Sequence, residues 1–389
     1  MNSMEYKVLT FSVGFYFLIY GLLLTLYPHT FSIHTYISFI SFPIFFIIGL
    51  LISRYVFFYK PIEKNNLSDF NLDKKINEYG LIFMIITLWI IAIYSIENIF
   101  QYGILYREIY TTESQRIFGN VFISYFFKNF YIYLAYFLLI RFLCLKNISL
   151  VKKFSIMLLT LLPLSIITLG RFPTYEIIFF SIVIVFFGDG RNVKKILIAS
   201  IVFALTISTA VFSLKVSSEN VPLFLIVEEI FFDYFVNYHF IGFYFVDWVV
   251  ENNALFLSKN YPCNSLGFLE DFFIYFFENL YGSDLGTSCM RHNGDFFTKG
   301  IHIAELDGRY NTFITNITPL YIDGGIAGVM LGGLFYGLLA GIKKSNTQII
   351  SPILLLSCLC LFFGVFMPKF SDQIYFLFFI YLLLYKIFL

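Results

Sequence analysis

The sequence predicts an all-α protein, a polytopic integral membrane protein with about ten transmembrane helices and one large external loop. Three observations predict it. Of the 389 residues, 59% are hydrophobic and only 13% are charged, half the charge of an ordinary soluble domain, which is about 25%. The chain also holds 53 Phe and 29 Tyr, more aromatic surface than one soluble core can bury. Finally, long apolar runs recur, and a helical crossing needs about 20 such residues.

Ten apolar runs without strong helix breakers give the expected spans. Two of them, 154–169 and 175–187, are short for a full crossing, so the turn that joins them is expected at or below the lipid surface. The runs divide the chain into an N-terminal bundle (1–214), a large external loop (215–316) and the C-terminal spans (317–389). In chain order they are Val8–Tyr27, Tyr36–Phe58, Leu81–Phe100, Val121–Leu143, Phe154–Leu169, Tyr175–Phe187, Ile196–Leu214, Ile317–Gly341, Ser351–Met367 and Ile374–Leu389.

The basic residues set the orientation of these spans, because short cytoplasmic loops carry an excess of Lys and Arg. Sixteen of the 26 Lys and Arg residues fall on alternate connections, and the opposite short connections carry only Arg107, Arg116, Arg171 and Lys369. Both termini are therefore expected in the cytoplasm and the loop 215–316 outside. The formal net charge of +1 argues against a nucleic-acid partner.

The external loop is acidic and aromatic, with five cations against thirteen carboxylates. Two of its stretches, Phe224–Val250 and Leu266–Leu280, combine aromatic and acidic residues, as do helices that lie along a membrane surface. Aromatic faces and carboxylates also bind sugar rings, which is the alternative role for these stretches. Cys263 and Cys289 both lie in this loop, where an oxidising compartment permits a disulfide that would hold the loop. The sequence leaves open whether the disulfide forms.

The motifs that the sequence lacks narrow the chemistry. It contains no G-x-x-x-x-G-K-[ST] loop, no D-x-D pair and no histidines at metal-ligand spacing. Its longest internal cytoplasmic connection, 59–80, is too short for a nucleotide-binding domain. We therefore expect no ATP, no metal and no other cofactor. An enzyme of this kind needs a substrate that is already activated and arrives from the membrane or the external space, and a lipid-linked donor meets both conditions.

The first charged site is the external turn 169–176 between the two short spans. Charge at membrane depth is costly and is usually paired or functional. Arg171 and Glu176 fit a simple ion pair that locks this helical hairpin. The functional alternative is that Arg171 binds a phosphate bidentately at the membrane surface.

The second charged site lies near the end of the external loop. Arg291 and Arg309 stand in an otherwise acidic segment, which a phosphate ligand would explain, although Asp295 allows a plain helical ion pair with Arg291 instead. His292 and His302 lie in the same segment. An imidazole titrates near neutrality, at about 6.5, so either histidine suits a general base, and a polar surface role is the alternative for each.

The third site leads into the expected span 317–341. Gly333, Gly337 and Gly341 have the four-residue spacing that lets two helices pack closely. Asp323 lies just inside the external boundary of this span and needs a partner. An arginine of the preceding segment is the expected one.

In this layout the chain resembles the bacterial O-antigen polymerases, the Wzy family of oligosaccharide repeat-unit polymerases, which are related to the O-antigen ligases. The resemblance covers the number of spans, the external Gly-Arg turn midway along the chain, the large late external loop and one run of residues that enters a glycine-rich span. That run is Asn311-Thr312-Phe313, then Pro319-Leu320-Tyr321-Ile322-Asp323-Gly324-Gly325, then Gly328.

The resemblance implies transfer of a growing glycan from undecaprenyl diphosphate to another lipid-linked repeat unit, on the periplasmic side of the bacterial inner membrane. It implies that Arg171, Arg291 and Arg309 stabilise the leaving diphosphate without a metal, and that His292 or a loop carboxylate takes the acceptor's proton. Undecaprenyl-diphosphate-linked oligosaccharides and membrane lipid are the implied partners, and docking of a chain-length regulator is left open. The expected substrate-binding residues are Glu176, His302, Glu305, Asn311 and Asp323.

Three other functions share part of this pattern. An O-antigen ligase, which transfers the finished chain to the lipid A core, shares nearly every feature. A flippase or transporter for the lipid-linked unit predicts two related halves around a central path, and the sequence shows no such internal repeat. An acyltransferase on cell-envelope sugars needs a paired His/Asp motif, which is not seen in the sequence.

Overall fold

The computed structural model is helical almost throughout the residues that it describes. Within them, the strands β1 (Ile301–Ile303) and β2 (Gly308–Tyr310) form a small antiparallel hairpin. The described residues are 2–26, 31–57, 67–102, 105–106, 109–110, 115–168, 172–188, 193–203, 206, 238–259, 261–281, 288–289, 292–293, 301–303, 308–310, 315–342, 348–364 and 373–388.

Helices lie where the apolar runs predict them. Five described helical stretches are long and apolar enough to cross a membrane, which supports an all-α, multi-pass membrane protein. The expected span 196–214 is described at 196–203 and 206, where it is helical. The helices of the expected spans are α1 (Ser3–Leu26), α2 (Ile33–Ile52), α3 (Leu67–Tyr102), α6 (Val121–Phe126), α7 (Ile132–Cys144), α8 (Leu150–Thr168), α9 (Phe172–Phe186), α15 (Ile317–Ala340), α16 (Pro352–Phe363) and α17 (Gln373–Phe388).

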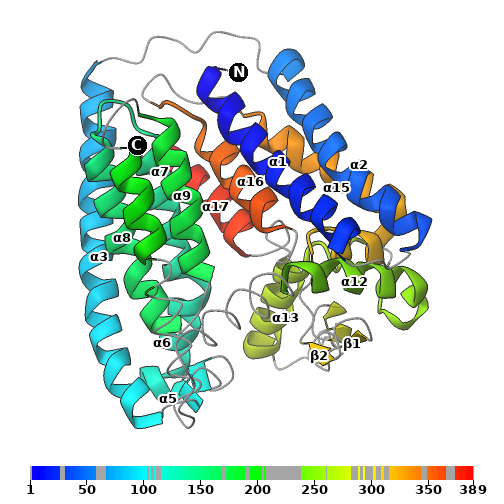
Figure 1. Ribbon diagram of the computed structural model, residues 1–389. Coiled ribbons are helices and arrows are strands. Elements are labelled where there is room, and N and C mark those ends of the chain that lie inside the picture. Colours follow the sequence, from blue (N-terminus) through cyan, green and yellow to red (C-terminus); the bar gives the residue numbers. More distant parts are fainter. Residues whose placement is uncertain are drawn as a thin grey trace.

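The helices form two groups that are inclined to each other (Figure 1). One group contains α3, α7, α8 and α9, and the other contains α1, α2 and α15. Helix α16 contacts both α1 and α7 and is buried along its whole length, so it joins the two groups. The loop helices α12 (Tyr238–Glu251) and α13 (Gly267–Tyr281) lie with the β-hairpin at one end of the second group (Figure 1). These loop elements therefore cover one end of the bundle.

Helices α2 and α15 pack closely because glycine removes the side chains between them. A Cβ atom on Gly337 would lie 2.0 Å from the carbonyl oxygen of Phe46, and one on Gly333 would lie 2.6 Å from that of Phe42. On the other helix, a Cβ on Gly49 would lie 2.2 Å from the carbonyl oxygen of Leu334. The close helix packing predicted from the glycine spacing is confirmed.

Basic side chains tie helix ends together at the end of the bundle that is expected in the cytoplasm. Arg54 forms an ion pair with Glu5 at 3.3 Å, which links the region after α2 to the start of α1. The Arg141 guanidinium lies 3.4 Å from the centre of the Tyr385 ring, so it joins α7 to α17. Lys153 donates to the carbonyl oxygen of Leu145 at 2.8 Å. Each of these basic side chains therefore adds a polar contact near a helix end.

Candidate functional site

Helix α15 is broken near its start, at the end that is expected outside. Gly324 (φ −159°, ψ 18°) and Gly325 (φ 60°, ψ −148°) leave the helical conformation and separate the segments 317–323 and 326–340. The backbone of Gly325 lies in a region that only glycine adopts without strain. In a membrane, non-helical backbone is tolerated where it is buried in protein or lines a polar cavity. The break is therefore a natural place for a site, and the sequence analysis did not foresee it.

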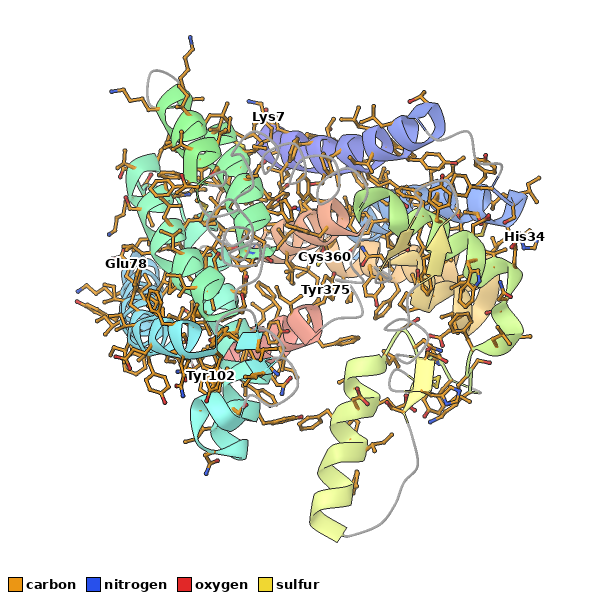
Figure 2. The ribbon with its side chains drawn as sticks, turned by 60° about the horizontal axis from the view of Figure 1, so that its bottom comes forward. Lys7, His34, Glu78, Tyr102, Cys360 and Tyr375 are labelled. Carbon is orange, nitrogen blue, oxygen red and sulfur yellow. A yellow bond between two sulfur atoms is a disulfide. The ribbon has the colours of Figure 1, made fainter. Side chains whose placement is uncertain are left out.

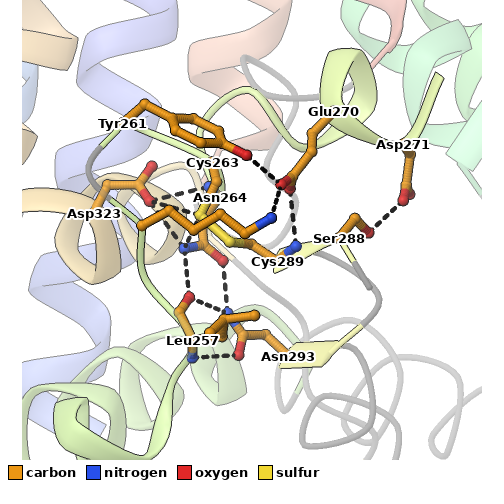
Figure 3. Close-up of polar contacts among 11 residues, drawn as sticks. Leu257, Tyr261, Cys263, Asn264, Glu270, Asp271, Ser288, Cys289, Asn293 and Asp323 are labelled. Carbon is orange, nitrogen blue, oxygen red and sulfur yellow. Dashed lines mark hydrogen bonds and ion pairs between the residues drawn. A yellow bond between two sulfur atoms is a disulfide. The ribbon is translucent and has the colours of Figure 1, made fainter. Parts of the chain in front are cut away.

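Asp323 stands directly before the break and binds the external loop (Figure 3). Its Oδ1 atom accepts from the backbone N–H of Asn264 at 3.0 Å and from the side-chain amide of Asn264 at 2.9 Å. Its Oδ2 atom accepts from the backbone N–H of Ser265 at 2.7 Å. These partners in the described part of the chain are an amide and two main-chain groups, where the sequence analysis expected an arginine. Asp323 is therefore the point at which the loop docks onto α15.

A disulfide closes the docked segment. Cys263 and Cys289 are bonded, with their Cα atoms 5.8 Å apart, so the bridge that the sequence left open is present. Asn293 lies beyond it, fully buried, and its side chain exchanges hydrogen bonds with the backbone of Leu257 at 2.9 and 3.0 Å. It also donates to Asn264 at 2.7 Å. The disulfide and the two asparagines thus connect the loop segments around Asn264 and around Cys289 to Asp323 (Figure 3).

Glu270, in the first turn of α13, is a second carboxylate of this region and is buried (Figure 3). It accepts from Lys259 Nζ at 2.5 Å, from the Tyr261 hydroxyl at 2.7 Å and from the backbone N–H of Cys289 at 2.8 Å. Burial favours the neutral acid, but these three donors outweigh it and hold the pKa of Glu270 below its ordinary value of 4.5. Hydrogen bonding to Glu270 raises the pKa of Lys259. The pair is therefore ionised at neutral pH.

The Glu270–Lys259 pair predicts an acid limit for the folded loop. A carboxylate with a lowered pKa contributes stability above its unfolded pKa and loses it as the pH falls through the folded value. The melting temperature of the purified protein should therefore drop below about pH 4.5. Glu270→Gln should melt lower than the parent at pH 7 and lose less between pH 7 and pH 3.5. An equal acid loss in both proteins would contradict this assignment.

The disulfide also determines whether the side chains of this region could bind a metal ion. Among the described residues, one group of side chains has potential metal-ligand atoms within 4.8 Å of one another, and it consists of Cys263, Glu270 and Cys289. The two sulfur atoms are bonded to each other, and metals bind thiolates. With the bridge closed, the group offers one carboxylate that already accepts three hydrogen bonds. We therefore assign this group of three residues a structural role, which is to hold the loop together.

His292 is the expected general base whose side chain the structure describes. It lies in a short helical turn, where its backbone N–H donates to the carbonyl oxygen of Ser288 at 3.0 Å. Its side chain is exposed, whereas the neighbouring Asn293 is buried. The disulfide at Cys289 and the hydrogen bonds of Asn293 fix the backbone on both sides of His292. The turn therefore presents an imidazole on a backbone that is held in place.

Two other expected residues meet in the β-hairpin. His302 and Arg309 are opposite each other in the antiparallel register of β1 and β2. The hairpin thus brings a candidate base and a candidate phosphate ligand to adjacent positions of the backbone. The expected residues that lie outside the described residues are Arg171, Arg291, Glu305 and Asn311.

Glu176 is buried in α9, with 1% of its surface exposed, and accepts a hydrogen bond from the hydroxyl of Tyr136 in α7. Sequence reasoning did not identify this partner, because Tyr136 lies in the middle of an apolar run with no signal of its own. The carboxylate therefore contributes to the contact between two helices, whatever its relation to Arg171.

A further set of contacts surrounds the first residues of α2 and α15, and no motif in the sequence predicts it. Buried Asp247 of α12 accepts from the backbone N–H of Ser32 at 2.8 Å and from the hydroxyl of Thr35 at 2.6 Å. The Nδ1 atom of His34 lies 3.1 Å from the hydroxyl of Tyr321, two residues before Asp323. Asp247 thus joins α12 to the start of α2, and the contact between His34 and Tyr321 joins α2 to the first segment of α15.

The arrangement provides a loop that is closed by a disulfide, bound by Asp323 at a helix break and equipped with an exposed imidazole. Such a site can bind a polar head group at the membrane surface and move a proton. Comparisons with family models, curated proteins and solved structures give no match for this chain, so its function has to be inferred from the residues themselves.

Proposed function

We propose that this protein is a membrane glycosyltransferase that polymerises undecaprenyl-diphosphate-linked oligosaccharide repeat units on the periplasmic side of a bacterial inner membrane. The observation that carries the proposal is the docking of the loop at the break of α15. Asp323 binds the loop segment that the Cys263–Cys289 disulfide closes, and His292 follows that disulfide by three residues. A lipid diphosphate reaches such a place from the membrane, and a sugar reaches it from outside.

In the proposed reaction, an acceptor hydroxyl attacks the anomeric carbon of the donor sugar. The new glycosidic C–O bond forms as the C–O bond to the diphosphate breaks, and the electron pair of that bond leaves with the phosphate. His292 or a loop carboxylate takes the proton of the hydroxyl. Arg171, Arg291 and Arg309 stabilise the charge that develops on the leaving diphosphate, since guanidinium groups bind phosphate bidentately.

Removal of the arginines tests the proposal. In a host deleted for this gene, expression of the chain should restore the ladder of surface glycan on a gel. Arg171→Ala, Arg291→Ala and Arg309→Ala should each shorten or abolish the ladder, because the leaving group loses its counter-charge. Lys215→Ala removes another cation of the expected external loop, to which the mechanism gives no role, and should leave the ladder unchanged.

The same strains distinguish a polymerase from a ligase. A deletion that leaves one repeat unit on the lipopolysaccharide identifies a polymerase, whereas loss of every unit identifies a ligase. A full ladder from all three arginine variants, at protein levels matched by immunoblot, would end the assignment.

A further inference from the structure

Helix α13 has a clamped end and an open aromatic face. At its start, Glu270 binds Lys259, and Asp271 accepts a hydrogen bond from Ser288. Farther along, Phe273 is 53% exposed and Phe277 is 38% exposed, with their rings stacked at a centroid distance of 6.5 Å. The acids therefore hold the start of the helix on the disulfide loop, and two aromatic rings farther along the helix are exposed. Figure 2 shows α13 extending from the body of the molecule.

A continuous ladder of rings connects this face to a membrane-spanning helix. The Phe272 ring packs edge to face against Phe130 at 6.1 Å and lies 5.8 Å from Phe273. Phe130 in turn stacks with Phe126 at 5.9 Å. Phe126 and Phe130 belong to the stretch 123–144, one of the five that are long and apolar enough to cross a membrane. The ladder thus runs from the external end of a span onto the loop helix.

The surface at the start of this ladder is itself apolar and open. Ile123 is 54% exposed and Phe126 is 50% exposed on the spanning stretch, as expected for side chains that face lipid. The exposed rings of α13 continue that surface. Aromatic residues are enriched at the headgroup level of membranes, and amphipathic helices bury an apolar face there. Glu270 and Asp271 hold the start of α13 on the loop, and the exposed rings lie about one and two turns farther along the helix.

We infer that α13 lies in the outer leaflet of the bilayer, with Phe273 and Phe277 inserted among the lipids. Bilayer lipid is the occupant because the aromatic face is continuous with a surface that already faces lipid. Since Glu270 ties α13 to Lys259 and to the backbone of Cys289, the membrane surface also sets the height of the disulfide loop. This inference is independent of the proposed glycosyltransferase activity.

Tryptophan fluorescence tests the depth of the ring. The full-length Phe273→Trp variant, in a background with Trp89→Phe and Trp248→Phe, is placed in vesicles of phosphatidylethanolamine and phosphatidylglycerol, with or without lipid brominated on its acyl chains. We expect quenching by the brominated lipid to lower the emission by roughly twofold or more, because such helices insert about 5–10 Å into the acyl boundary. Aqueous iodide should quench it weakly.

Ser258→Trp in the same background is the matched control, because Ser258 is exposed on the same loop beside the Glu270 clamp. Its emission should respond to iodide and not to brominated lipid. Phe277→Trp gives a second reading on α13, and a gel without reductant confirms that the disulfide has formed in each variant. Iodide quenching of Phe273→Trp equal to that of Ser258→Trp would place α13 in water. Shielding of Phe273→Trp from both quenchers would place it against a second copy of the chain, and either result overturns the inference.

Discussion

Replacing Gly337 with leucine is expected to separate α2 from α15 and to give the largest loss of stability of any single change in the membrane region. A Cβ atom at this position would lie 2.0 Å from the carbonyl oxygen of Phe46, and backbone cannot rotate out of the way. Overpacking typically costs about 1–3 kcal/mol where side chains can adjust, so the loss here should reach or exceed the upper end. In lipid there is no hydrophobic attraction between helices that could offset this loss, because helices there associate through close packing.

The thermal unfolding midpoint in detergent measures the effect of this substitution. Gly14→Leu is the matched control, because Gly14 lies in the apolar helix α1 and a Cβ there meets no atom within 4 Å. The control should melt like the parent, whereas Gly337→Leu should melt much lower or fail to accumulate. Equal melting of the two variants would mean that α2 and α15 are not held by the glycine contact.

The contact between α2 and α15 was predictable because it depends on composition and spacing. Three glycines spaced four residues apart in an apolar run indicate a helix face on which another helix can pack closely. The apolar runs themselves indicate which helices are surrounded by lipid. The break at Gly324 and Gly325 was not predictable in the same way. Both residues occur in a run whose other glycines, such as Gly333, remain helical, and only the backbone angles distinguish them.

The candidate site shows the same division. Cys263 and Cys289 are the candidate pair that the sequence offers, because both lie in the expected external loop, but the sequence leaves the bond itself open and the structure supplies it. The partners of Asp323 could not be foreseen, because two of its three hydrogen bonds come from main-chain N–H groups, which nearly every residue offers. Chemical reasoning from residue types therefore favoured an arginine, and the fold supplied backbone from a segment about 60 residues away.

Removing the carboxylate of Asp323 is expected to release the loop segment around Asn264 from α15. Asp323→Ala leaves the backbone N–H groups of Asn264 and Ser265 without their acceptor, and the side-chain amide of Asn264 keeps the carbonyl oxygen of Leu257; both residues are buried. Each buried group that loses its partner costs about 1–3 kcal/mol. The loop should then open locally, so trypsin added from the external side should cleave after Lys259 much faster than in the parent.

The comparison with Asp323→Asn and with a double Cys263→Ser, Cys289→Ser variant identifies the interaction that docks the loop. Asparagine keeps one acceptor for Asn264 but turns an amide toward the donor of Ser265, so it should give intermediate cleavage. The double variant loses the bridge and retains the acceptor, so its loop should stay docked more firmly than that of Asp323→Ala. If instead Asp323→Ala is as resistant as the parent while the double variant is cut, the disulfide and not Asp323 holds this segment of the loop. The helix break would then have no part in positioning His292, and the proposed site would lose its connection to the membrane.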